Sequence, residues 1–266
     1  LFMVGAYAAA AVAGHTGSFA LAALAALAAA GGAGLAVEFL VIRRLYDRDH
    51  LDQVLATFGL LLFFNELVAT LAGRTPLFMQ PPAWLGGAVE IIPGVPYPTF
   101  RLAILATGVA VAAGLAFLIA RTRLGMLIRA GATHPEIVAA MGVNVRLLNT
   151  LVFGLGAALA GLAGLMAGPI LSVQPGMGEP ILILTLVVIV TGGIGSIRGA
   201  FYGALIVGIV DTIGRAFLPT LLREFLERSL AQAAGPAIAS MLIYVLMAVV
   251  LAIRPHLVWG PGDTQL

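Results

Sequence analysis

The chain has 266 residues, of which 61% are hydrophobic and only 10% are charged, and its mean hydropathy is +1.08. Soluble domains carry about a quarter charged residues, so this balance excludes an ordinary soluble enzyme and indicates a membrane protein. The net charge is +2, and the 14 basic residues are all arginines scattered between apolar blocks. They form no continuous basic face, so no nucleic-acid partner is expected.

A bilayer core is crossed by about 20 apolar residues in a helix, so the chain has room for roughly seven or eight spans. In chain order we expect apolar helices at residues 1–13, 19–42, 54–72, 102–120, 147–170, 180–191, 200–213 and 236–253. The segment 215–235 mixes Arg and Glu with Leu and Phe, which predicts an amphipathic helix at the membrane surface. The predicted fold is all-α: a polytopic transmembrane helix bundle that forms one domain over residues 1–266. Because the chain begins at Leu1, inside an apolar run that is short for a span, we also expect a natural N-terminal segment to precede it.

Arginine placement predicts the orientation, because Lys and Arg favour the cytoplasmic side of a membrane. If the spans alternate, nine of the 14 arginines share one side: Arg43, Arg44, Arg48, Arg121, Arg123, Arg129, Arg146, Arg198 and Arg254. The other side has Arg74, Arg101, Arg215, Arg223 and Arg228. We therefore expect the first set and the C-terminus in the cytoplasm, and the Pro- and Gly-rich connection 73–98 outside.

Missing residue types remove several classes of chemistry. Without Cys there are no disulfides, thiolate nucleophiles or Cys-ligated metals. Without Lys there is no Walker A phosphate loop and no Schiff base. The histidines, at positions 15, 50, 134 and 256, lack metal-ligand spacing, so no zinc site is expected. We expect no cofactor here and, if ATP supplies the energy, a separate chain that binds it.

Small residues recur at helical spacing and predict close helix packing. Gly164 and Gly168 are four residues apart, as are Gly199 and Gly203, and Ala157 and Gly161 extend the first pattern. In lipid, such residues let helix backbones approach, so that van der Waals contact drives association. The alternative is a ligand path lined by exposed backbone.

The charged connection 121–146 contains a predicted short helix. Thr133, three residues before Glu136, predicts a capping box, with Pro135 in the first turn and Gly142 at the C′ position. A helix of about eight residues is too short to span and is marginal alone in water. With Ile137, Val138 and Met141 expected on one face, it must dock either on this protein or lipid, or on a cytoplasmic partner; the spacing leaves both open.

A glycine run and a few polar residues within spans are candidates for the transport path. Glycines at 192, 193, 195 and 199 disfavour a regular helix, which indicates either a tight cytoplasmic turn or a broken helix that lines a path. Charge inside a membrane is costly, but Glu38 and Asp211 lie near helix ends and are expected to pair with arginines. The candidate path residues are Asn65, Glu66, Thr191, Gly192, Gly193, Gly195 and Ser196.

Several segments carry a resemblance to a known family. Residues 129–142, with Arg129 and Gly131 before the short helix and Ala-Ala-Met-Gly at its end, resemble the coupling loop of ABC importer permeases. The run 192–200 closely resembles a signature of the LivH/LivM branched-chain amino acid permeases, with Arg198 where that family often has Pro. Residues 3–7, 37–46 and 56–60 resemble further stretches of this family, closer to the LivH type.

The resemblance implies a permease subunit, not an enzyme, of an ABC importer in the bacterial inner membrane. Such a subunit carries branched-chain or other hydrophobic amino acids with a second permease, cytoplasmic ATP-binding subunits and an extracytoplasmic solute-binding protein. The implied coupling helix to the ATPase comprises Thr133, Pro135, Glu136, Ile137, Ala139, Ala140, Met141 and Gly142. Two alternatives remain: a permease of the same architecture for urea or short amides, and an ion-coupled secondary transporter that uses Glu66, the one deep acid. An intramembrane hydrolase is disfavoured because no histidine lies within a predicted span to activate Ser196.

Overall fold

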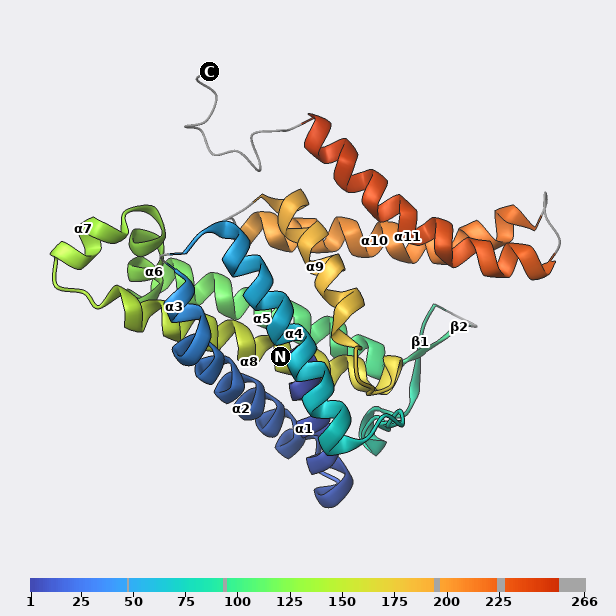
Figure 1. The fold of residues 1–266 in the computed structure, drawn as a ribbon. Coiled ribbons are helices and arrows are strands. Elements are labelled where there is room, and N and C mark those ends of the chain that lie inside the picture. Colours follow the sequence, from blue (N-terminus) through green and yellow to red (C-terminus); the bar gives the residue numbers. More distant parts are fainter. Residues whose placement is uncertain (47, 93–94, 194–196, 224–227, 254–266) are drawn as a thin grey trace. The chain divides into compact units, whose positions relative to one another are not determined.

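The computed structural model describes residues 1–46, 48–92, 95–193, 197–223 and 228–253, and these are largely α-helical (Figure 1). Five of the described helices are long and apolar enough to cross a membrane: Phe19–Leu45, Leu51–Ala72, Thr99–Arg121, Val145–Leu171 and Gly199–Leu222. The predicted all-α membrane fold is confirmed. The chain divides into two compact units, Leu1–Gly178 and Glu179–Leu266, and the single domain stays a prediction.

The first unit contains most of the helices and a small β-hairpin. Its elements are α1 (Phe2–Thr16), α2 (Phe19–Val37), a π-helical continuation (Glu38–Ile42), α3 (Arg43–Leu45), α4 (His50–Ala72), β1 (Ala88–Ile92), β2 (Val95–Pro98), α5 (Thr99–Arg121), α6 (Arg123–Thr133), α7 (Pro135–Ala140) and α8 (Val145–Leu171). Polar side chains begin three of the helices: Ser18 accepts from the Leu21 N–H, Thr122 from the Gly125 N–H and Asn144 from the Leu147 N–H.

Helices α1, α2 and α8 form the core of this unit through backbone-to-backbone contact. A Cβ built on Gly164 would lie 2.2 Å from the Phe2 carbonyl oxygen, and one on Gly161 would lie 2.6 Å from the Ala26 carbonyl oxygen. A Cβ on Gly34 would lie 2.2 Å from that of Ala157. The predicted small-residue packing of α8 is therefore confirmed, because nothing larger than glycine fits at these crossings. In contrast, α5 buries only Phe100.

The connection 73–98 contains an element that the sequence reasoning did not predict. β1 and β2 pair antiparallel, with Ala88 opposite Pro98 and Val89 opposite Tyr97. Both strands of a two-stranded sheet are edges, so prolines are tolerated in β2. The same connection also pairs with the loop after α8, where Leu77 and Val173 exchange two backbone hydrogen bonds of 2.8 Å.

The second unit consists of α9 (Gly178–Gly192), α10 (Ile197–Leu222) and α11 (Arg228–Ile253). The amphipathic helix expected at 215–235 is wrong, because α10 continues through its first part and α11 begins at Arg228. Asp211 Oδ1 and Arg215 Nε pair at 2.7 Å, one turn apart, and this i,i+4 ion pair, which the sequence predicted, lets the charges remain within one continuous helix.

Candidate functional site

The short helix predicted in the connection 121–146 is present as α7, with six residues. Pro135 occupies its first turn, as expected. At the other end, the Gly142 N–H donates to the Ala139 carbonyl (3.0 Å) and the Val143 N–H to the Val138 carbonyl (3.3 Å). With a φ of +84° at Gly142, this is a Schellman ending, and the predicted C′ role of Gly142 is confirmed.

The predicted capping box of α7 is wrong. Thr133 is the last residue of α6, and its hydroxyl donates backwards to the Arg129 carbonyl oxygen at 2.9 Å. His134 takes the N-cap position of α7, without a side-chain hydrogen bond. The reason is that α6 runs to within one residue of α7, so the Thr133 hydroxyl completes the helix before it. Glu136 remains in the first turn of α7, where a negative charge is favourable.

The apolar side chains of α7 point in two directions. Val138 is buried, with 5% of its surface exposed, whereas Ile137 and Met141 are 58% and 78% exposed. The expectation that all three share a face is therefore wrong for Val138. Ala139 and Ala140 are exposed as well. Val138 anchors the helix to its own chain, and Ile137 and Met141 form an outward apolar pair.

The base on which α7 rests is built from α6 and the start of α8. A Cβ on Gly131 of α6 would lie 3.1 Å from a terminal methyl of Leu148, which is buried. At the other end of α6, a Cβ on Gly125 would lie 2.4 Å from the backbone of Ile119, so the turn from α5 is tight as well. In Figure 1 α7 lies next to α6, at the end of the unit where α8 begins.

A buried charged network joins α2 to this same end of α8. Glu38 has no exposed surface, and its Oε2 lies 3.2 Å from Arg43 Nη2. The Thr150 hydroxyl donates to the same Oε2 (2.8 Å) and accepts from Arg43 Nη2 (2.8 Å). Burial raises the pKa of the adjacent Tyr46 hydroxyl, and the charge of Glu38 raises it further while Arg43 opposes. The pairing of Glu38 with Arg43 was predicted, but Thr150, which follows 112 residues later, carried no signal in the sequence.

The first pair of candidate path residues lies on α4. Glu66 Oε1 forms an ion pair with Arg74 Nη2 at 3.0 Å, and both side chains are largely exposed. Asn65 is half-buried. Glu66 precedes the end of α4 by six residues, about 9 Å along the axis, so Arg74 can reach back to it. The role of both residues in a path stays a prediction.

The second group belongs to the other compact unit, at the end of α9. The Thr191 hydroxyl donates to the Val187 carbonyl oxygen at 2.8 Å. A Cβ on Gly192 would lie 2.4 Å from the Gly199 carbonyl oxygen, and Gly193 is buried with a φ of +87°. Gly195 and Ser196 lie outside the described residues. Gly192 thus permits a close helix crossing, and Gly193 adopts the left-handed backbone conformation of a turn. Both observations favour the interpretation of this run as a tight turn.

Replacing Gly192 with alanine tests whether this glycine is needed for packing or for a path. We expect loss of about 1–3 kcal/mol of stability, because a Cβ would press on the backbone of α10. Thermal unfolding in detergent measures this change. Gly208→Ala, on α10 with no atom within 4 Å of its Cβ, is the matched control. A Gly192→Ala protein of normal stability that no longer transports would instead favour the path role.

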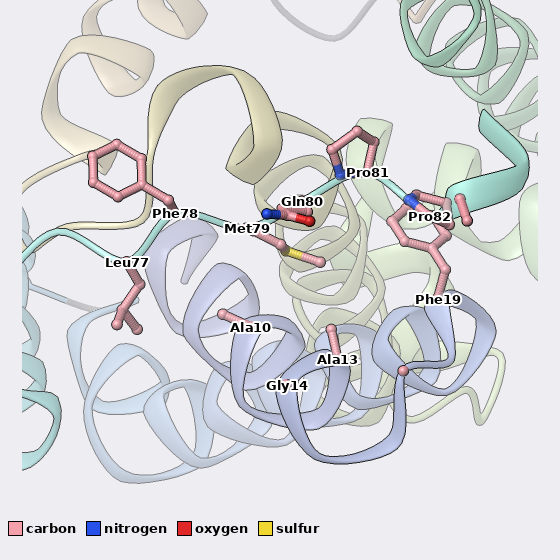
Figure 2. A pocket seen from close by; sticks show the side chains of 12 residues that line it. Ala10, Ala13, Gly14, Phe19, Leu77, Phe78, Met79, Gln80, Pro81 and Pro82 are labelled. Atoms are coloured by element: carbon pink, nitrogen blue, oxygen red, sulfur yellow. The ribbon is translucent and has the colours of Figure 1, made fainter. Parts of the chain in front are cut away.

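A cavity of about 440 Å³ opens at the other end of α2 from the charged network. Figure 2 shows the extended segment from Leu77 to Pro82 crossing over Ala10, Ala13 and Gly14 of α1, with Phe19 beyond them. Phe78 is 84% exposed, whereas Met79 is buried. The volume is in the range of small-molecule pockets. Asn65, Glu66 and Thr191 are not among its lining residues.

A second cavity, of about 420 Å³, lies between α5 and α8 and is almost entirely apolar. Its lining includes Ile104, Val111, Leu162 and Met166, with Thr107 as a polar side chain. The Thr107 hydroxyl donates to the Ala103 carbonyl oxygen of its own helix. This groove therefore offers shape and apolar surface but little polar recognition.

Comparison with known proteins identifies relatives of the chain. Residues 1–251 match the family described as the permease component of branched-chain amino acid transport systems. The chain is 26% identical over 201 residues to the high-affinity branched-chain amino acid transport system permease protein LivH of Salmonella typhimurium, covering 74% of this chain and 65% of that protein. It is 29% identical over 186 residues to BraD of Pseudomonas aeruginosa, a permease protein of the same description, covering 68% of this chain and 60% of BraD.

No solved structure matches the chain. The family match spans nearly its whole length, and the described helices agree with a multi-pass membrane protein. The chain therefore belongs to the family of permease components of branched-chain amino acid transport systems.

Proposed function

We propose that this chain is the membrane-spanning subunit of an ATP-driven importer for branched-chain or other hydrophobic amino acids. The observation that carries the proposal is α7, whose outward apolar pair, Ile137 and Met141, is fixed to the chain by the buried Val138. Exposed apolar side chains on a short helix fit a groove in a partner protein. The branched-chain substrates named for LivH and BraD support the choice of solute.

The partner that receives α7 is a cytoplasmic ATP-binding subunit. The absence of lysine, and so of a Walker A loop, from these 266 residues supports a separate ATP-binding subunit. When that subunit closes on ATP, its groove moves Ile137 and Met141. The contacts of α7 and of α6 with α8 carry this displacement into α8. The close crossings of α8 with α1 and α2 then move the three helices together.

The arginines support an orientation with α7 in the cytoplasm. Arg43 and Arg44 of α3, and Arg123, Arg129 and Arg146 around α7, gather at one end of the first unit. The positive-inside rule assigns that end to the cytoplasm. The cavity beneath residues 77–82 is separated from it by the length of Phe19–Leu45, 27 residues or about 40 Å, so it faces outside, where a solute-binding protein delivers the substrate.

Apolar helices such as α5, whose side chains are mostly exposed in the single chain, have to be shielded from water by lipid or by another protein. α5 buries little of its surface, so lipid or a second permease subunit, identical or related, surrounds it. We propose that the transport path involves the second permease as well as this one, in the bacterial inner membrane, with the C-terminus in the cytoplasm.

Reconstitution into proteoliposomes with the cognate ATP-binding subunits and solute-binding protein tests the proposal. In vesicles with the ATP-binding subunits inside and the solute-binding protein outside, we expect uptake of labelled leucine that requires ATP enclosed in the vesicle. Uptake that continues without those subunits, or that stops when a proton or sodium gradient is abolished, would reject the proposal in favour of an ion-coupled transporter. The Glu66–Arg74 pair argues against that alternative. An acid that couples transport to protons or sodium has to bind and release that ion within the membrane, whereas the Glu66 side chain is exposed and already paired with Arg74.

The substrate class is tested in the same vesicles. Excess unlabelled isoleucine or valine is expected to suppress leucine uptake, whereas urea and acetamide are expected to leave it unchanged. The opposite pattern, uptake of labelled urea without leucine uptake, would assign the chain to the short-amide alternative.

A further inference from the structure

The network of Glu38, Arg43 and Thr150 has two atoms without a hydrogen-bond partner in the part of the chain that the structure describes. They are Glu38 Oε1 and Arg43 Nε, and both are buried. The other oxygen of Glu38 is crowded, since Oε2 accepts from both Arg43 Nη2 and the Thr150 hydroxyl. A buried network that is only partly satisfied is costly, so a different pairing of the same groups is energetically accessible.

The two unpartnered atoms are those that a second arrangement would use. An arginine and a carboxylate pair most strongly when two parallel N–H···O bonds form, one from Nε and one from an Nη atom, to the two carboxylate oxygens. Pairing Arg43 Nε with Glu38 Oε1, beside the existing Nη2–Oε2 contact, would complete this geometry. In this geometry the carboxylate no longer depends on Thr150 for its second hydrogen bond, and the Thr150 hydroxyl has an alternative acceptor on its own helix, the Arg146 carbonyl oxygen at 2.9 Å.

A rearrangement of the hydrogen bonds among Glu38, Arg43 and Thr150 would change the contact between α2 and α8, because the network lies between these two helices. Thr150 lies in the second turn of α8, directly after the α6–α7 segment, while Glu38 begins the π-helical continuation of α2. Just beyond, α2 and α8 touch through Leu35 and Gly154, where a Cβ would lie 2.6 Å from a Leu35 methyl. The hydrogen bonds of this network therefore connect α2 to the part of α8 that α7 would move.

We propose that Glu38, Arg43 and Thr150 form a two-position latch that couples α7 and the start of α8 to α2. In the closed position Thr150 bridges Glu38 and Arg43, and α2 follows α8. In the open position Arg43 and Glu38 pair through two bonds, Thr150 bonds only to its own helix, and the first turns of α8 move relative to the π-helical end of α2, while the glycine crossings still hold the rest of the two helices together. The three are positioning residues of transport, and the inference rests on the proposed function.

The test compares Thr150→Val with Thr150→Ser in the complete reconstituted transporter. Valine keeps the branched shape of threonine but has no hydroxyl, so the closed position cannot form. We expect the amount of leucine taken up per ATP hydrolysed to fall about tenfold, equivalent to ~1.4 kcal/mol of coupling. Serine keeps the hydroxyl and can form the same hydrogen bond to Glu38. The ratio of leucine taken up to ATP hydrolysed is therefore expected to stay within about twofold of that of the unchanged protein.

Asp211→Asn is the control for loss of an ordinary ion pair, because the Asp211–Arg215 pair is half-exposed and lies on α10, in the other compact unit. It is expected to leave the uptake-to-ATP ratio unchanged. A normal ratio for Thr150→Val, equal losses for the valine and serine variants, or a valine variant that fails to assemble would each overturn the latch. Absence of ATP-dependent uptake by the unchanged protein would instead reject the proposed function, so the two failures are distinguishable.

Discussion

Replacing Gly164 with alanine is expected to destabilise the first unit by about 3 kcal/mol, the upper end of the cost of overpacking. The added Cβ would lie 2.2 Å from the Phe2 carbonyl oxygen and 3.1 Å from the Ala6 backbone nitrogen. Both neighbours are backbone atoms of α1, so no side chain can rotate away and the helices have to separate. Thermal unfolding in detergent, followed by the loss of the folded peak in size-exclusion chromatography, measures the change.

Gly156→Ala is the matched control for this prediction. Gly156 lies on the same helix, and no atom lies within 4 Å of its Cβ position. Alanine is the better helix former, so the control is expected to be as stable as the unchanged protein or slightly more stable. If both variants lost the same stability, the helix itself rather than the crossing with α1 would be responsible.

Replacing Ile137 with aspartate is expected to abolish ATP-driven uptake without unfolding the chain. Ile137 is 58% exposed, so the charge costs the free subunit little, but in an apolar groove it would be buried without a partner. Central apolar contacts of an interface are worth at least ~2 kcal/mol, so binding of the ATP-binding subunit should weaken about 30-fold or more. Co-purification and uptake measure the loss, and thermal unfolding should be unchanged.

Two further variants separate a lost interface from other effects of charge. Ala130→Asp adds the same charge to an exposed position of α6 and is expected to keep ATP-driven uptake. Val138→Asp places it on the buried side of α7, so it should lower thermal stability as well as uptake. Normal uptake with Ile137→Asp, or equal losses with Ala130→Asp, would remove Ile137 from the docking surface.

Local patterns in the sequence predicted much of the fold, because they depend on neighbours a few residues away. Pro135 and Gly142 mark the ends of α7 through backbone geometry alone. The spacing of Gly161 and Gly164 predicts a close crossing, although it does not say that α1 and α2 are the partners. The predicted capping of α7 by Thr133 is wrong because Thr133 lies at the junction of two helices. Its hydroxyl donates to the Arg129 carbonyl oxygen of α6 instead of accepting from an N–H of α7.

Long-range pairing and charge-rich helices were harder to predict. Arg43 lies five residues after Glu38 and was expected to pair with it, but Thr150 is brought to both only by the packing of α8 on α2. In 215–235 the density of charges suggested a surface helix. The structure instead keeps Arg215 inside α10, where Asp211 neutralises it.

The contrast between α5 and α8 affects how the two helices can change over evolutionary time. On α8, Gly161 and Gly164 tolerate no side chain, so almost every substitution there should be removed by selection. On α5, Leu105, Val109 and Phe117 are more than half exposed and can exchange for other apolar residues at little cost. Among natural variants of this protein, sequence divergence should therefore accumulate on α5 while hydropathy is preserved, and Gly161 and Gly164 of α8 should remain nearly constant.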